Sequence, residues 1–140
     1  MKAVGFDGKT RNWNVSKYIV AKDDSRRRSK LHVRVRETLQ NLFPYDTILE
    51  EVPLPGSNKP SRRSTLYADF FIPQPRLVVE ANGRQHYEHI SHFHPTKAHF
   101  FKSKGRDKDK IRWCEINDIE IVIFKYSDTD EQWKQSILDR

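Results

Sequence analysis

Two carboxylates stand inside apolar stretches near the middle of the chain. Asp69 lies in the run Tyr-Ala-Asp-Phe-Phe-Ile, and Glu80 lies in the run Leu-Val-Val-Glu-Ala-Asn-Gly. Because burying an unpaired carboxylate costs several kcal/mol, such acids must pair with cations, take up protons or bind a metal. The alternative is that both side chains point to solvent from the open face of a sheet.

Oxygen ligands of this kind suit Mg²⁺ or Mn²⁺. We therefore expect Asp69, Glu80 and the backbone carbonyl of Ala81 to hold one of these cations. His86 follows Gly83, which permits a sharp bend that returns the imidazole toward the carboxylates. A neutral imidazole accepts a proton from an attacking water, while a metal stabilises charge on a phosphate. The expected chemistry is the hydrolysis of a phosphodiester.

A hairpin must position these side chains. Residues 65–72 and 76–80 are apolar runs joined by Pro-Gln-Pro, a pattern typical of two strands and a tight turn. Before them, apolar residues at helical spacing predict a helix over about 27–43, followed by a strand over 47–52. Residues 53–64 are rich in Pro, Ser and Gly and are expected to form a loop.

The C-terminal half supplies the remaining elements. A basic helix is expected over about 96–116, ending at Asn117-Asp118. The β-branched run 119–124 is typical of a strand buried on both faces, and Asp128 or Thr129 is expected to cap a last helix. Residues 1–22 favour short irregular strands and turns. The order αβββαβα predicts an α/β domain with a sheet flanked by helices.

Composition favours one domain and a polyanionic partner. A chain of 140 residues suits a single core, and 26 Lys+Arg against 19 Asp+Glu give a formal charge of +7. Two basic strips suggest the two walls of a groove for DNA. The strips contain Arg26, Arg27, Arg28, Lys30, Arg34 and Arg36, and then Lys102, Lys104, Arg106, Lys108, Lys110 and Arg112.

Other partners and compartments are disfavoured. The sequence has no run of about 20 apolar residues and no apolar segment of a signal peptide near its start, so we expect no contact with membranes. Cys114 is the single cysteine and cannot form an internal disulfide. We expect an intracellular, cytoplasmic protein, acting in the host cell if a phage encodes it.

The motifs around the two acids resemble a known family. They are Tyr67-Ala-Asp-Phe-Phe, Val-Val-Glu80-Ala-Asn-Gly-Arg-Gln-His86, and Asp107-x-x-Lys110 before a closing apolar strand. The pattern is similar to the PD-(D/E)XK nuclease superfamily, in particular to very short patch repair endonucleases and phage homing endonucleases with an E-D-x-H-D active site. The resemblance covers roughly residues 25–126, with 1–24 as an irregular extension and 127–140 as a C-terminal helix.

The resemblance implies a restriction-endonuclease-like αβββαβ core with a mixed sheet, and a Mg²⁺-dependent DNA endonuclease of phage or mobile-element, homing type. It implies that Asp69 and Glu80 bind metal, that His86 is the general base or a phosphate contact, and that Asp107 is a further acid. Asn82 stands where the family has lysine, so His86 or a helix lysine, Lys108 or Lys110, must take over that role.

The sequence leaves several alternatives open. For the acid of the first helix, Glu37 and His32 are both candidates. Zinc held mainly by histidines is disfavoured because the chain has no Cys-x-x-Cys. A non-catalytic DNA-binding module and a dimeric junction resolvase remain alternatives to the endonuclease. The chain is expected to act as a monomer or a homodimer.

Overall fold

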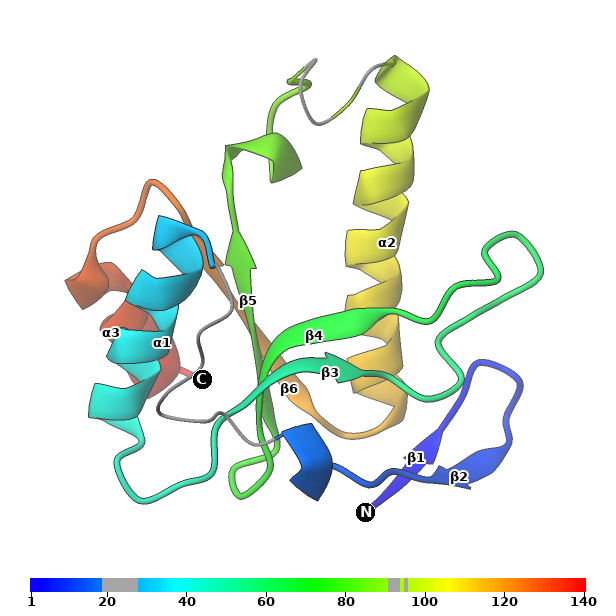
Figure 1. The fold of residues 1–140 in the computed structure, drawn as a ribbon, viewed down its shortest axis with the longest axis horizontal. Coiled ribbons are helices and arrows are strands. Elements are labelled where there is room, and N and C mark those ends of the chain that lie inside the picture. Colours follow the sequence, from blue (N-terminus) through cyan, green and yellow to red (C-terminus); the bar gives the residue numbers. More distant parts are fainter. Residues whose placement is uncertain (19–27, 91–93, 95) are drawn as a thin grey trace.

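The computed structural model describes residues 1–18, 28–90, 94 and 96–140. Its main feature is a mixed four-stranded sheet with helices on both faces (Figure 1). Neighbouring strands in the order β3-β4-β5 are antiparallel, and β5 pairs with β6 in parallel. The strands are β3 (Leu49–Pro53), β4 (Tyr67–Ile72), β5 (Leu77–Asn82) and β6 (Glu120–Lys125). The predicted α/β class and the order of elements from the first long helix onward are confirmed.

Side-chain caps set the starts of the three α-helices in the described part of the chain. Ser29 and Thr96 accept hydrogen bonds from backbone N–H groups three residues ahead, and Thr129 forms a capping box with Gln132. None of these helices is both long and apolar enough to cross a membrane. The helices are α1 (Lys30–Leu42), α2 (Lys97–Ile116) and α3 (Asp130–Leu138).

Alternation along the strands gives the sheet two different faces. Phe70 of β4 and Val79 of β5 pack with α1 and α3 in one hydrophobic cluster. Phe71 and Val78, the neighbouring residues, pack with Trp113 of α2 in a second cluster. Since successive side chains of a strand point to opposite sides, one face carries α1 and α3 and the other carries α2 (Figure 1).

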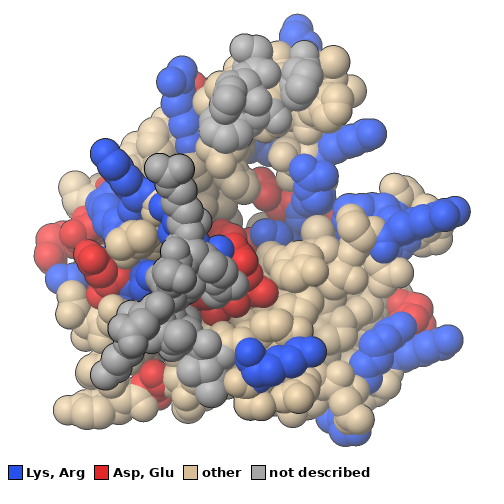
Figure 2. Space-filling view, viewed as in Figure 1, with Lys and Arg blue, Asp and Glu red and all other residues tan. Residues whose placement is uncertain are grey.

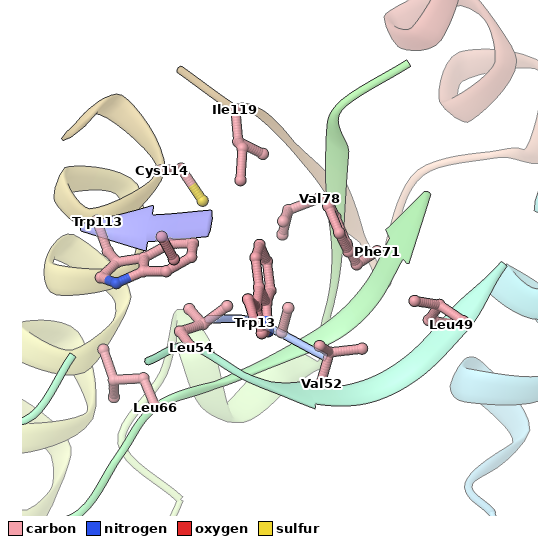
Figure 3. Packing of buried hydrophobic residues seen from close by; sticks show 12 residues of the cluster. Trp13, Leu49, Val52, Leu54, Leu66, Phe71, Val78, Trp113, Cys114 and Ile119 are labelled. Carbon is pink, nitrogen blue, oxygen red and sulfur yellow. The ribbon is translucent and has the colours of Figure 1, made fainter. Parts of the chain in front are cut away.

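The N-terminal segment is part of this second cluster. It forms a hairpin of β1 (Lys2–Val4) and β2 (Thr10–Asn12), followed by a 3₁₀ turn η1 (Ser16–Tyr18). Trp13 stacks on Phe71 with ring centroids 4.8 Å apart and meets Trp113 edge-on at 5.2 Å (Figure 3). Its indole N–H also donates to the carbonyl of Pro53. The residues expected to be an irregular extension therefore complete the core.

The expectation that 119–124 is a strand buried on both faces is wrong. β6 is the last strand of the sheet and pairs only with β5 among the described strands. Ile123 is 40% exposed, whereas Phe124 is fully buried. A run of β-branched residues predicts a strand, but it does not distinguish an edge position from a central one.

Replacing Trp13 should test whether the hairpin is integral to the fold. We expect Trp13→Ala to lower the free energy of unfolding by about 3–5 kcal/mol, because it removes a fully packed aromatic ring and leaves a cavity. Urea denaturation followed by circular dichroism measures the change. Tyr45→Ala is the matched control, since Tyr45 is 98% exposed and should change stability little. A loss below about 1 kcal/mol for Trp13→Ala would show that the hairpin is dispensable.

Candidate functional site

Asp69 and Glu80 meet where β4 and β5 separate. Regular pairing of the two strands ends at Phe70 opposite Val79, and β4 then curves away from β5 (Figure 1). The backbone N–H of Asp69 donates to Glu80 Oε2 at 2.8 Å. In return, the N–H of Ala81 donates to Asp69 Oδ2 at 2.9 Å. The two carboxylates thus accept the main-chain hydrogen bonds that the parting strands can no longer exchange.

Lys110 of α2 adds a positive charge to this pair. Its Nζ lies 2.5 Å from Glu80 Oε1, and the Glu80 side chain is only 5% exposed. Burial, reinforced by the Asp69 carboxylate, raises the pKa of Glu80, and the ammonium of Lys110 opposes that rise. Burial alone would lower the pKa of Lys110, but Glu80 and Asp69 raise it overall, so the lysine stays charged. Lys110 therefore balances the charge of the carboxylates within the fold.

His86 and Asp107 form a second pair beside the carboxylates. His86 ends the 3₁₀ turn η2 (Arg84–His86), and its Nδ1 lies 3.0 Å from Asp107 Oδ2 on α2. Both side chains are 23% exposed. Since an ionised carboxylate only accepts hydrogen bonds, the ring carries its hydrogen on Nδ1 and donates it to Asp107. In the neutral ring, Nε2 is then free to accept a proton.

These groups share one cleft of about 710 Å³. Asp69, His86, Asp107 and Lys110 line it, while Glu80 lies behind them, bonded to Lys110. Figure 2 shows a hollow near the centre of this face, where acidic and basic side chains meet. The structure thus brings the four residues that were expected to be catalytic, Asp69, Glu80, His86 and Asp107, close together.

The donor groups of the cleft fit a hard divalent cation in part. Asp69 Oδ1 takes part in no hydrogen bond with a described residue, and Asp69 faces the cleft. Mg²⁺ typically uses one or two carboxylates and keeps several waters, which suits the pair Asp69 and Glu80. Among the described residues, however, no three His, Cys, Asp or Glu side chains are grouped to hold a metal. Further ligands would have to come from water, substrate or the Ala81 carbonyl.

Most residues of the first basic strip that the structure describes are engaged in contacts within the fold. Arg34 donates from Nε to Asp130 Oδ1 at 2.7 Å and lies 3.8 Å from the Trp133 ring, which holds α1 against α3. Arg28 pairs with Glu51, and Lys30 is exposed. Arg26 and Arg27 lie outside the described residues. Because α1 and α2 pack on opposite faces of the sheet, the helical parts of the two strips do not form two walls of one groove.

The second strip divides between the cleft and other surfaces. Lys102 and Arg106 line the cleft, and Arg106 also contacts the hydroxyl of Ser103 at 3.2 Å. Lys104 instead lies over the ring of Tyr87, 5.1 Å from its centroid. Lys108 is exposed outside the cleft. Lys102 and Arg106 are therefore the cations of this strip best placed to meet a ligand in the cleft.

A buried acid on the other face of the sheet was not anticipated. Glu50 of β3 is 6% exposed, and Arg36 donates to it from Nε at 2.6 Å and from Nη2 at 2.9 Å. His32 Nε2 also contacts Glu50, and its ring stacks on Phe70. Glu37 is exposed on α1. The open question about the first helix is thus answered: within the described residues, neither His32 nor Glu37 lines the cleft.

Glu51 is a second acid that sequence reasoning missed. It lines the cleft, and the register of β3 and β4 places it level with Asp69. Its φ of 51° is in the left-handed region, which is uncommon for a residue other than glycine. His94 and His99 also line the cleft. The sequence did contain a signal for Glu51, since Glu50 and Glu51 are consecutive in a predicted strand. Alternation along a strand sends neighbouring side chains to opposite faces, so one of the two is expected on the face that carries the cleft.

The fold and site define an α/β protein with a mixed sheet and a charged cleft. Two curated viral proteins are similar in sequence. "Uncharacterized protein 307L" of Invertebrate iridescent virus 6 is 38% identical over 65 residues, 46% of this chain and 33% of that protein. "Uncharacterized protein 033L" of Invertebrate iridescent virus 3 is 30% identical over 104 residues, 71% of this chain and 50% of that protein. The chain thus spans half or less of these relatives, and no protein-family model or solved structure matches it.

The Glu50 cluster should make stability depend on pH in acid. Burial tends to raise the pKa of Glu50, but hydrogen bonds from His32 and Arg36 outweigh it and lower the pKa to about 2. The folded pKa is thus below the ordinary value, so the ionised form stabilises the protein above about pH 4.5. That stabilisation is lost as the pH falls toward about 2.

Comparison of wild type with Glu50→Gln measures this contribution. The difference in the free energy of unfolding should be constant near neutral pH and shrink between about pH 4.5 and 2. Glu120→Gln serves as the matched control, because Glu120 is exposed on β6. A difference that stays constant down to about pH 2 would contradict the assigned role.

Proposed function

We propose that this chain is a metal-dependent DNA endonuclease that hydrolyses phosphodiester bonds. The single observation that carries the proposal is the arrangement around the cleft. Asp69, the His86–Asp107 pair and Lys110 line the cleft, and Glu80 lies behind them, next to Asp69 and Lys110. An acid pair that binds a cation, a histidine that accepts a proton and a nearby ammonium are the groups that phosphodiester hydrolysis requires.

In this proposal Asp69 and Glu80 hold Mg²⁺ or Mn²⁺, and the Ala81 carbonyl is available as a third oxygen ligand. A bound divalent cation would stabilise the negative charge that develops on the scissile phosphate. Lys110 opposes the rise in the pKa of Glu80 that burial and Asp69 cause, and it therefore favours the ionised form that can bind a cation. This lysine reaches the carboxylates from α2, which supplies the charge missing at Asn82.

His86 is the proposed general base. Its Nδ1–H is held by Asp107, which fixes the orientation of the ring and the tautomer. Nε2 of the neutral ring then takes a proton from the attacking water. Asp107 is a positioning residue in this scheme, since it acts through His86.

Lys102 and Arg106 are proposed to bind the phosphates that flank the scissile bond. Such contacts supply affinity without sequence information. An enzyme of this kind would act inside the cell, on DNA. The similarity to proteins of two iridescent viruses is compatible with a role in a virus or a mobile element, and neither of these relatives is a phage protein.

One observation favours a second candidate, a non-catalytic DNA-binding module. Lys110 already forms an ion pair with Glu80, and the described residues contain no group of three metal-ligating side chains. In such a module the carboxylates would serve only to hold α2 against the sheet. Cleavage assays separate the two functions.

Cleavage of plasmid DNA with Mg²⁺ or Mn²⁺ is the direct test. We expect the wild type to nick the plasmid, and Asp69→Asn and Glu80→Gln to reduce the rate about 100-fold or more, because they remove the proposed cation ligands. His86→Ala should reduce it by about 10²–10⁴-fold, the range for loss of a general base. Rates are read from the conversion of supercoiled to nicked plasmid on a gel.

Glu120→Gln is the matched control for Glu80→Gln and should cut at the wild-type rate. Circular dichroism shows whether each variant is folded. If the wild type binds DNA but cuts it with neither cation, the endonuclease proposal is wrong and the binding module is favoured. If Asp69→Asn and Glu80→Gln both cut normally, the assigned site is wrong.

The contribution of Lys102 and Arg106 to DNA binding should be measurable from the dependence of affinity on salt concentration. Each phosphate contact contributes about 0.9 to the slope of log affinity against log salt for duplex DNA. Removing both cations with Lys102→Ala/Arg106→Ala should therefore reduce the slope by about 2. Fluorescence anisotropy at several salt concentrations gives the slope, and Lys134→Ala on α3 should leave it unchanged. An unaltered slope in the double variant would place the bound DNA elsewhere.

A further inference from the structure

One wall of the cleft carries an exposed aromatic ring. Tyr67, the first residue of β4, is 54% exposed and lines the cleft. Other large hydrophobic side chains exposed in the described part of the chain, including Tyr45 and Phe101, do not line it. An aromatic ring in contact with solvent loses stabilisation that packing would supply, so its place in a charged cleft requires an explanation.

Tyr67 is on the same side of β4 as the proposed cation ligand Asp69. The two residues are two positions apart on the strand, and both line the cleft. The rise of a strand separates their backbones by about 7 Å. A nucleotide whose phosphate lies at Asp69 therefore has a neighbouring base within reach of the Tyr67 ring.

The part of the cleft that α2 lines presents positive charge without carboxylate partners. Lys102 forms no ion pair with a described residue, and Arg106 donates a hydrogen bond to the hydroxyl of Ser103. By contrast, Lys59 and Arg62 near the cleft are both paired with Asp109. Cations that stay unpaired beside a cleft are available to bind phosphates.

An exposed aromatic ring and unpaired cations that line one cleft are features of sites that bind single strands. Every base has a face that can stack on tyrosine, while the backbone phosphates meet the cations. In a duplex the bases stack on one another and present only their edges in the grooves. Tyr67 can therefore stack on a base only where that base is unpaired.

We propose that Tyr67 is a base-stacking residue and that the cleft takes single-stranded DNA, at an unpaired or displaced stretch of the substrate. This inference rests on the proposed function for the identity of the ligand as DNA. It does not depend on cleavage, because the stacking contact and the phosphate contacts form in the bound state. Tyr67 would thus determine specificity for unpaired DNA.

Binding without catalysis tests the proposal. Fluorescein-labelled oligothymidylate, an abasic strand of the same length and a hairpin duplex are titrated with the full chain in EDTA. The wild type should bind oligothymidylate more tightly than the abasic strand, and Tyr67→Ala should weaken oligothymidylate binding roughly 5- to 150-fold, the loss of one stacked base. Affinity for the abasic strand and the duplex should change less than about twofold, since their phosphate contacts remain.

Two variants separate stacking from folding. Tyr67→Phe keeps the ring and should restore wild-type affinity, and Tyr45→Ala should have no effect on any probe. Unchanged oligothymidylate binding by Tyr67→Ala, or an equal loss on all three probes, would overturn the stacking role. Such a result with intact metal-dependent cleavage would leave the endonuclease proposal standing. A Tyr67 effect without any cleavage would support the stacking site and overturn the endonuclease.

Discussion

The candidate site depends on the hydrogen bonds that link Asp69 with Glu80 and Ala81, together with the ion pair between Glu80 and Lys110. Two strands that separate must leave main-chain N–H groups without strand partners, and here the carboxylates accept them. The resulting negative charge attracts a lysine from α2. Asp107 lies three residues before Lys110 on α2, so the orientation of the helix that brings Lys110 to Glu80 also brings Asp107 to His86. The packing of one helix thus positions both pairs of chemical groups.

The acidic side chains on the two faces of the sheet differ in their hydrogen-bond partners and in their contact with solvent. On the α1 face, Glu50 is held by three hydrogen-bonding contacts from His32 and Arg36, and the cluster is nearly closed to solvent. On the α2 face, Asp69 keeps an oxygen without a described partner, and it borders a cleft. A carboxylate whose lone pairs are satisfied stabilises the fold, whereas one with an open oxygen beside solvent can bind a ligand.

Much of the fold was predictable because its signals are local. Helix caps, apolar spacing and the Pro-Gln-Pro turn lie within a few residues of the elements they define, and the structure has those elements at nearly the expected positions. The packing of Trp13 against Phe71 was not predictable, since it joins residues far apart in sequence. The exposure of Ile123 was missed for a related reason: strand order, not composition, decides which strand is at an edge.

By itself, the sequence determined that Asp69 and Glu80 are neighbours, because a tight turn sets the register of the hairpin that carries them. It also placed the three α-helices close to where the structure has them, although it did not fix their bounds. Only the tertiary structure decided which cations serve the fold and which face the cleft. Arg34 and Lys102 have the same formal charge, yet one is held by Asp130 and the other lines the cleft. The reason is that the partner of a side chain depends on how helices pack on the sheet, which residue type and spacing do not specify.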